Sequence, residues 1–329
     1  MNRLPTIIKH GLRKLIEVYF KIHFSWPVWW YVINRKPRAL FAANRPILNT
    51  VQKRIVGDLN EQGIAITSLQ ELFPKQPNLL SELQAYADTL NKRKEDEDVS
   101  LVKPFLRYLW DKTPTLTLAN PFHRLVLDPK IIDVANSYIG MFTNFYILML
   151  NVTVPVGHDA KTIISQRWHR DHEDKKLCKL FLYLNDVDEQ AGPFIYVPYS
   201  KYETKWGTIF PQQVPKGVYP RDGEVEKIIP AGEIKKMTGM AGTLLWCDTS
   251  GLHKGGHAFS KERLMLTAGY RTRASASPDK IIKTGISLDK MPPSVHYALT
   301  SRVPIPISRI MFEAYRNLRD KREKKMEMD

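Results

Sequence analysis

Three side chains able to bind a metal stand at two places in this sequence. His169 and Asp171 are two residues apart within Gln166–Asp174. In a β-strand, residues i and i+2 point to one face, so this spacing would present an imidazole and a carboxylate together. His253 lies far along the chain, next to glycines, and could complete the set. Two histidines and one carboxylate that leave metal positions open are typical of non-haem iron(II) oxygenases.

A cation follows the second part of this set. Arg263 comes ten residues after His253, at the start of an apolar run. An enzyme that uses a dicarboxylate cosubstrate needs a buried cation at a fixed distance from its metal, and the planar fork of arginine matches a carboxylate. Taken alone, Arg263 would be interpreted as a surface or salt-bridging arginine, and the His-x-Asp pair as an ordinary surface pair. Their combination favours a site.

Four motifs occur in a fixed order from Trp168 onwards. They are WHRD at Trp168–Asp171, LNDVDEQAGPFIYVPYS at Leu184–Ser200, GLHKGG at Gly251–Gly256, and the downstream Arg263. In this order and spacing, the sequence resembles the phytanoyl-CoA dioxygenase-like family of iron(II)/2-oxoglutarate-dependent oxygenases. The resemblance covers about a third of the chain.

The resemblance implies a fold, a ligand set and a reaction. The fold is a double-stranded β-helix, the jelly roll of cupin-like proteins. His169, Asp171 and His253 carry over as iron(II) ligands, and Arg263 as the anchor for the distal carboxylate of 2-oxoglutarate. The implied reaction consumes dioxygen and 2-oxoglutarate, releases succinate and carbon dioxide, and hydroxylates a C–H bond. Related halogenases have Ala or Gly at the position of Asp171, so the carboxylate favours hydroxylation.

The sequence departs from the family pattern at two places. Family members usually have Gly-Ser-His after the Val-Pro pair, whereas Tyr199, Ser200 and Lys201 stand here. Many relatives also have Ser or Thr two residues after the anchoring arginine, where this chain has Met265. We therefore expect a changed turn, and a second hydroxyl for the carboxylate either comes from elsewhere or is absent.

Other polar residues could take part in the site. His257 also lies in the Gly-rich turn, but only six residues before Arg263, so we favour His253. His172 would face the opposite side of a regular strand from Asp171. Lys179 and Asn151 lie in apolar runs, where a polar side chain needs a reason, and either could contact 2-oxoglutarate or substrate. Trp168 and Trp246 are expected to pack in the core.

The distribution of apolar residues predicts a mainly β protein with flanking helices and a jelly-roll core. Residues 1–140 are expected to be a mostly helical N-terminal region, 141–275 the catalytic core, and 276–329 a C-terminal segment that ends in an amphipathic helix, all in one integrated domain. Short apolar or β-branched runs predict the core strands. These runs are Asn144–Val154, Leu177–Leu184, Gly192–Pro198, Val225–Ile229, Gly242–Trp246 and Arg263–Tyr270.

Helical spacing of apolar residues marks the flanking regions. Two helices are expected before residue 60, a short one follows a Ser-x-x-Glu capping signature, another ends in a charged run, and the last follows Pro306. The first two helices are marked by Ile8, Leu12, Leu15, Ile16 and Tyr19 and by Leu48, Val51, Ile55 and Leu59, with Gly63 as the stop of the second. The short helix carries Ser68 and Glu71 at its start, and the next helix is expected to start near Asn78 and to end in Arg93–Asp98. In the last helix, Ile307, Ile310, Met311 and Leu318 are predicted to line one side.

Positive charge is concentrated at the amino terminus. The formal net charge is +15, and residues 1–54 contain eleven Lys/Arg against one acid, Glu17, or 11 − 1 = +10. Such a patch indicates an anionic partner. Because Phe24–Val32 is rich in aromatic residues, we expect residues 1–45 to dock on an anionic membrane surface, unless these aromatics pack on the core. No nucleic-acid-binding module is recognisable.

The remaining features limit the location and the class of protein. No run of about 18 uncharged apolar residues occurs, and no signal peptide is evident. Cys178 and Cys247 do not form a disulfide framework, which favours a reducing compartment. We therefore expect a cytoplasmic protein, peripheral at the inner face of a membrane if the amino terminus docks, that needs no obligate protein partner.

Two alternatives to the oxygenase stay open. One is a non-catalytic jelly-roll protein that binds an anionic surface, and the other is a cupin-type metal enzyme that does not use 2-oxoglutarate. The intact ligand set argues against the first, and the spacing of Arg263 argues against the second. The substrate, small or lipid-linked, is not encoded in a pattern that we can identify.

Overall fold

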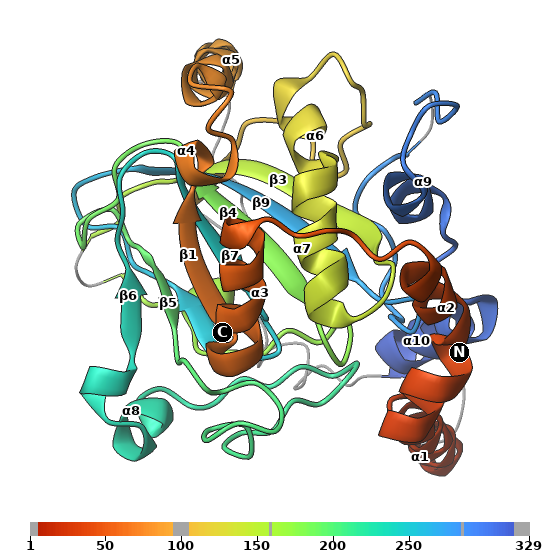
Figure 1. The fold of residues 1–329 in the computed structure, drawn as a ribbon. Coiled ribbons are helices and arrows are strands. Elements are labelled where there is room, and N and C mark those ends of the chain that lie inside the picture. Colours follow the sequence, from red (N-terminus) through yellow and green to blue (C-terminus); the bar gives the residue numbers. More distant parts are fainter. Residues whose placement is uncertain (1–5, 95–104, 158–159, 284–285, 319–329) are drawn as a thin grey trace.

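Two antiparallel sheets face each other at the centre of the molecule (Figure 1). The computed structural model describes residues 6–94, 105–157, 160–283 and 286–318. A six-stranded sheet has the order β1-β7-β4-β9-β3-β2, and a three-stranded sheet the order β6-β5-β8. This confirms the predicted jelly-roll core. The strands are β1 (Ile64–Ser68), β2 (Leu106–Tyr108), β3 (Asn144–Thr153), β4 (Cys178–Tyr183), β5 (Phe194–Tyr196), β6 (Lys235–Met237), β7 (Thr243–Cys247), β8 (His253–Gly255) and β9 (Arg263–Arg271).

Register assigns the side chains of the large sheet to its two faces. On β4, Lys179 pairs with Gly269 of β9 and with Cys247 of β7. Phe181 and Tyr183 follow Lys179 at intervals of two and belong to an inner cluster with Phe194, Tyr196 and Met237 of the small sheet. The alternate residues, among them Leu180 and Leu182, join the cluster beneath the helices. Because both faces of β4 are buried, its sequence is an almost continuous apolar run.

Helices cover the outer face of the large sheet. The helix α3 (Thr50–Gln62) packs against α7 (Pro129–Ile139) and β1, and it ends at Gly63 with φ +79°, the left-handed conformation that glycine adopts most readily. Helices α4 (Leu69–Leu72), α5 (Leu79–Lys94), α6 (Pro121–Val126) and α9 (Pro293–Thr300) complete this layer. The Ser68 hydroxyl caps α4 as predicted, by accepting from the Glu71 amide.

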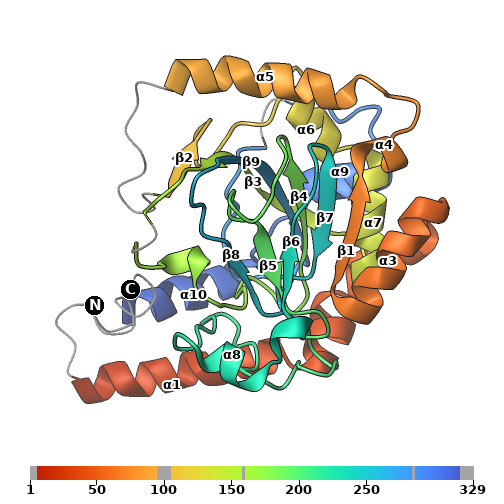
Figure 2. The same ribbon diagram turned by 90° about the vertical axis from the view of Figure 1, so that its left-hand side faces the viewer.

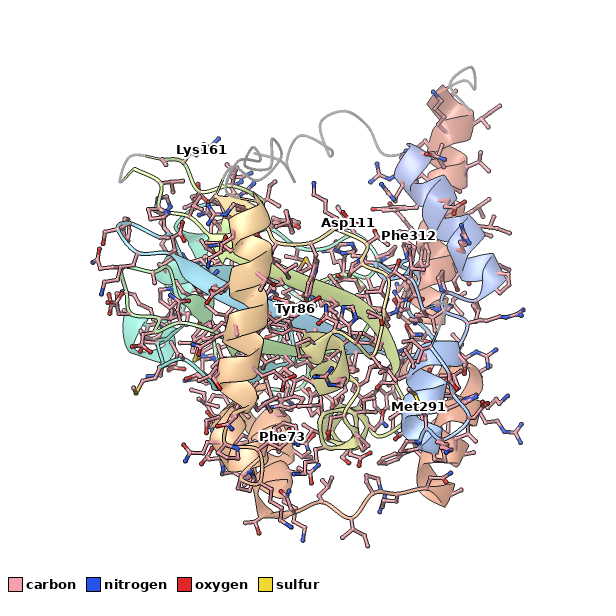
Figure 3. The ribbon with its side chains drawn as sticks, turned by 90° about the horizontal axis from the view of Figure 1, so that it is seen from above. Phe73, Tyr86, Asp111, Lys161, Met291 and Phe312 are labelled. Carbon is pink, nitrogen blue, oxygen red and sulfur yellow. The ribbon has the colours of Figure 1, made fainter. Side chains whose placement is uncertain are left out.

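A separate group of helices lies along one edge of the molecule (Figure 2). It contains α1 (Thr6–His23), the π-helical turn η1 (Val28–Ile33), α2 (Arg35–Ala43) and α10 (Pro306–Leu318). Seen from above, α1 and α10 lie side by side, and Phe312 lies on the inner side of α10 (Figure 3). The hydroxyl of Tyr19 on α1 is 2.9 Å from that of Ser308 on α10. The amino terminus is thus attached to the carboxyl-terminal helix.

Two expectations about these elements need correction. Strands β1 and β2 precede residue 141, so the sheet is not confined to the region 141–275. The run 225–229 is not a strand, because most of it forms α8 (Glu224–Ile228). Val225 and Ile229 are four residues apart and both belong to one buried cluster, as helical spacing allows. A run of five residues is too short for its spacing to distinguish a helix from a strand.

The two terminal helices are covered only in part. On α10, the buried residues are Ser308, Phe312 and Tyr315, whereas Ile307 and Ile310, two of the residues predicted to line one side, are exposed. On α1, the fully buried residues are Ile16, Phe20 and His23, and much of the predicted apolar stripe faces outwards. A hydrophobic period marks an apolar face, but not how much of it a neighbouring element covers.

A candidate metal centre

The three predicted metal ligands converge. One ligand atom from each of His169, Asp171 and His253 lies within 4.8 Å of the others, and all three residues are buried. The Nε2 atom of His169 is 3.8 Å from one Asp171 oxygen, and the Nε2 atom of His253 is 3.7 Å from the other. The imidazole centroids are 4.1 Å apart. Two segments that are distant in sequence thus meet around one point.

Backbone hydrogen bonds fix this meeting. The amide of His169 donates to the carbonyl of His253 at 2.9 Å, and the amide of His253 returns a bond to the carbonyl of His169 at 3.0 Å. The amide of Asp171 donates to the carbonyl of Thr249 at 2.9 Å. The segment that carries His169 and Asp171 is therefore extended, although only bridge-paired, and the two side chains share a face as their spacing predicted.

The hydrogen bonds of both imidazoles favour metal binding. The Nδ1 atoms of His169 and His253 lie 2.8 Å and 2.9 Å from the carbonyl oxygens of Arg167 and Gly251. Because a carbonyl oxygen can only accept, each Nδ1 carries the proton and each Nε2 offers a lone pair towards Asp171. Burial, followed by the neighbouring His253, lowers the pKa of His169 to about 3, and burial also lowers the pKa of His253. Both rings are therefore neutral at pH 7, the form that ligates metals.

A lysine lies beside the carboxylate of this centre. The Nζ atom of Lys179 is 2.5 Å from Asp171 and 3.8 Å from Glu173, and all three side chains are buried. Burial by itself would raise the pKa of Asp171, but the charge of Lys179 and the two histidines hold it well below its usual range. Burial opposes the charge on Lys179, yet Asp171 and Glu173 raise its pKa well above the ordinary value. Both partners are therefore charged.

Arg263 begins β9 inside the barrel. It pairs with Thr153 of β3, and it is only 4 % exposed. One terminal nitrogen of its guanidinium donates to the Thr153 hydroxyl at 3.0 Å and the other to the carbonyl of Gly192, while its Nε has no partner among the described residues. The hydroxyl that Met265 cannot supply beside this arginine thus comes from Thr153, on the neighbouring strand.

Asn151 stands next to Thr153 on the same face of β3. It is 3 % exposed and pairs in register with Met265. Its side-chain amide makes no hydrogen bond within the described part of the chain. Lys179 pairs with Gly269, six residues further along β9 than Arg263, so the two cations lie at different depths of the barrel. The structure places all three predicted polar residues on the interior face, with Lys179 at the candidate metal centre.

Arg170, which lies between two of the candidate ligands, was not among the predicted site residues. Its side chain points away from them, is 1 % exposed, and donates to five backbone carbonyls. Among the described residues no carboxylate pairs with Arg170, and burial lowers the pKa of its guanidinium to about 10. Strand alternation could have shown that it faces the other way, but not what it would meet. Its acceptors are the carbonyls of Ser200, Trp206, Ile209, Phe210 and Ser250.

The departure from Gly-Ser-His does not abolish the turn. Tyr199 occupies the usual glycine position with φ +58°, so a left-handed conformation is kept without glycine, at a cost of order 1–3 kcal/mol. Ser200 is fully buried, and its hydroxyl accepts from the amide of Leu252 at 2.8 Å. Because Leu252 precedes His253, this serine helps to position the second histidine.

The amino-terminal elements are joined to the segment that follows Asp171. The indole of Trp29 donates to Asp174 at 3.0 Å, and Asp174 also accepts from the amide and hydroxyl of Thr272. One ring nitrogen of His23, the Nε2, is 2.7 Å from the carbonyl oxygen of Ala274. Part of the predicted membrane segment therefore packs on the core, close to the candidate site.

The remaining candidates lie outside the cluster. His257 is half-buried, with its Nε2 3.2 Å from the carbonyl oxygen of Gly157, and His172 lines a different cavity. Trp168 and Trp246 are buried as expected, and the indole of Trp168 donates to Glu226 at 2.6 Å. Cys178 and Cys247 are buried free thiols.

Comparison with known proteins shows the fold. No protein-family model matches this sequence, and no curated protein matches it either. Among solved structures, the epimerase SnoN in complex with Fe3+, alpha ketoglutarate and nogalamycin RO is similar, with a TM-score of 0.50 at 16 % identity over 78 % of this chain and 93 % of that chain. The structure of EctD from S. alaskensis with 2-oxoglutarate and 5-hydroxyectoine has a TM-score of 0.50 at 15 % identity, over 74 % and 84 % respectively. At these identities the likeness establishes a shared fold.

Proposed function

We propose that this chain is a non-haem iron(II)/2-oxoglutarate-dependent dioxygenase that hydroxylates a C–H bond. The observation that carries the proposal is the orientation of two neutral imidazoles, whose Nε2 atoms face Asp171 while each Nδ1 is held by a carbonyl. A surface cluster of ionisable groups would not need this arrangement. A set of two histidines and one carboxylate suits iron(II) with open positions.

Each residue of the site has a role in this proposal. His169, Asp171 and His253 would hold iron(II), which with 2-oxoglutarate and dioxygen supplies the oxidising chemistry. Lys179 keeps Asp171 ionised, and therefore able to ligate, inside a buried site. The retained carboxylate favours hydroxylation, as it does in the family that the sequence resembles.

The cosubstrate would be held by the barrel interior. Arg263 is buried, charged and incompletely hydrogen-bonded, as an anchor for a carboxylate must be before its ligand arrives. Asn151 has a free amide on the same face, and Lys179 lies at the metal end. These positions support 2-oxoglutarate binding along the barrel, with Arg263 at its distal carboxylate.

The rest of the molecule supports a single catalytic unit. Strands before residue 141 belong to the same sheet as the strands of the core, and α10 contacts α1, so we propose one integrated domain. Its substrate would be a small molecule or a lipid-linked one. The non-catalytic alternative predicts a degraded ligand set, and the cupin-type alternative predicts no cation in the barrel.

One experiment tests the function. Protein loaded with iron(II) under anaerobic conditions should bind 2-oxoglutarate and develop the weak visible charge-transfer band of the chelate, and should then form succinate with oxygen. The variant Arg263→Gln should bind iron but lose the band at the same 2-oxoglutarate concentration. Iron binding without any response to 2-oxoglutarate would favour the cupin-type alternative, and the absence of iron binding would favour the non-catalytic one.

A further inference from the structure

The outward side of α1 is apolar over its whole length. Ile7, Leu15, Val18 and Ile22 are 86 %, 68 %, 53 % and 56 % exposed. With 3.6 residues per turn, these positions fall on one stripe, and Ile8 widens it. The opposite stripe, with Ile16 and Phe20, is already buried against the molecule. The helix therefore has a second apolar face that no described element covers.

Two elements that contact α1 also expose large apolar side chains. Tyr31 and Val32 of η1 are 61 % and 67 % exposed, and Ile307 and Ile310 of α10 are 52 % and 63 % exposed. A cavity of about 480 Å³ next to η1 is lined by Val32, by residues of α2 and by Ile305, just before α10. We call the exposed apolar residues of α1, η1 and α10 the α1–α10 face. Apolar side chains gathered in this way mark an interaction surface.

Unpaired cations border the α1–α10 face. Lys14 and Lys21 lie four residues before and three after Val18, next to the apolar stripe. Within the described part of the chain, neither has a carboxylate within 4.0 Å, whereas Arg13 on the same helix pairs with Glu17. The residues that the structure describes thus leave the positive charge beside the stripe without a neutralising partner.

Two cavities beyond η1 are also cationic. The cavity of about 480 Å³ is lined by Arg35, Lys36 and Arg273, and a second one of about 860 Å³ shares Lys36 and Arg273 and adds Arg302. Asp289, which lines the second cavity, is the acidic residue there. Among the residues that the structure describes, no carboxylate forms a salt bridge with Lys36, Arg273 or Arg302. Such cavities suit phosphate oxygens.

We infer that the α1–α10 face docks on the surface of a bilayer that contains anionic phospholipid. The apolar stripe enters the headgroup boundary, Lys14 and Lys21 lie among the headgroups, and the Lys36–Arg273 cavities receive lipid phosphates. No described helix is long and apolar enough to cross a membrane, so the contact is peripheral.

Charge decides between a bilayer and a second copy of the chain. In a two-fold dimer the same patch meets itself, so the positive charge of Lys14, Lys21 and Lys36 on one copy would face the positive patch of the other. An anionic bilayer neutralises them instead, at about 1 kcal/mol for each Lys or Arg near the surface. Charge complementarity therefore favours lipid.

Docking on this face would bring the candidate metal centre near the bilayer. The indole of Trp29 in η1 is hydrogen-bonded to Asp174, three residues after Asp171. A cavity of about 440 Å³ lies between α1 and the segment 212–216. The side-chain amide of Gln212 in this segment donates to the backbone carbonyl of Asp171 at 2.8 Å. This consequence rests on the proposed function, and it favours a lipid-linked substrate; the docking itself does not depend on iron or 2-oxoglutarate.

Flotation with lipid vesicles tests the docking on the full chain. Wild-type protein should float with vesicles of phosphatidylcholine plus phosphatidylglycerol, much less with phosphatidylcholine alone, and added salt should reduce the binding. Leu15→Glu/Ile22→Glu should weaken binding at least about tenfold, because two exposed apolar residues become anionic. Lys36→Glu/Arg273→Glu should abolish the preference for phosphatidylglycerol.

Matched controls lie at the other end of the molecule. Met240 is 74 % exposed, and nearby Gly242 accepts a hydrogen bond from Leu69 at the start of α4, on the side away from α1 (Figure 2). Met240→Glu and Lys75→Glu/Lys92→Glu should float like the wild type. Thermal unfolding should show that all variants are folded, since the changed residues are not buried.

Three outcomes would overturn the inference. The first is no flotation with phosphatidylglycerol vesicles at low salt. The second is equal flotation of Leu15→Glu/Ile22→Glu and Met240→Glu. The third is a dimer in light scattering that Leu15→Glu/Ile22→Glu dissociates, which would assign the face to a second copy. Because flotation needs no turnover, its result is separate from that of the succinate assay.

Discussion

The candidate metal centre and the α1–α10 face break the usual distribution of residues in opposite ways. At the centre, charged and polar side chains are buried and almost all restrained by hydrogen bonds, as with Lys179 and Asp171. On the face, large apolar side chains such as Ile7 and Leu15 lie in solvent, beside lysines that have no carboxylate partner in the described ranges. Buried polar groups and extended exposed apolar patches are the informative exceptions in a folded protein. Each therefore indicates a ligand that the chain alone does not provide.

The two regions also differ in how they are held. The centre is held by long-range backbone bonds, such as the reciprocal pair between His169 and His253. The α1–α10 face depends on a helix that contacts the core on one side only, through residues such as Phe20 and His23. Changes at the centre should therefore have large, specific effects, and changes at the face smaller ones.

The largest expected effect is at the ligands themselves. His169→Ala or His253→Ala should abolish stoichiometric iron(II) binding and succinate formation together, because each removes one of three protein ligands. Metal analysis of the purified variants measures this directly. His257→Ala, in the same turn but outside the cluster, is the matched control and should keep both. Full iron content in His253→Ala would show that the convergence of these side chains is not a metal site.

Next in size is the loss of Arg170. Arg170→Met should remove a donor from five backbone carbonyls, of which those of Ser200 and Ser250 are buried, and an unsatisfied buried group typically costs about 1–3 kcal/mol, so the loss should reach several kcal/mol. Thermal unfolding should shift down by several degrees or more. Arg35→Met, at an exposed position of α2, should change the unfolding temperature little. Equal shifts of the unfolding temperature in the two variants would mean that the segments whose carbonyls bind Arg170 are held by other contacts.

A smaller effect is expected at the cosubstrate anchor. Arg263→Lys keeps the charge but loses the fork, so the apparent KM for 2-oxoglutarate should rise roughly ten- to a hundredfold, the value of a charge-assisted hydrogen bond of about 1.5–3 kcal/mol. Iron(II) binding should be unchanged. If instead Lys179→Met raises this KM and Arg263→Lys does not, the anchor is the lysine beside Asp171.

The smallest expected effect concerns the attachment of α1. Burial lowers the pKa of His23 below the unfolded value of 6.5, so the folded state favours the neutral ring. As pH falls below about 6.5, the unfolded chain takes up the proton first, and stability decreases. Unfolding temperature should therefore fall between pH 7 and pH 5 by more in the wild type than in His23→Gln, which cannot titrate. Identical slopes in the two proteins would show that His23 does not contribute.

The sequence by itself determined the positions of the candidate ligands and most of the core strands. His169 and Asp171 share a face because any extended chain alternates its side chains, whatever surrounds it. Strands such as β3, β4 and β9 were predictable because both faces are buried, which requires continuous apolar runs. These properties follow from local geometry and composition, and they survive in the folded chain.

Only the tertiary structure decided what these residues meet. The sequence could not show that Lys179 pairs with Asp171, that Thr153 stands beside Arg263, or that Arg170 donates to carbonyls of two separate segments, 200–210 and Ser250. It also could not show which apolar residues of α1 would be covered, because periodicity records that a face is apolar but not whether another element lies against it. Partners across long sequence separations arise from packing, and no local pattern encodes them.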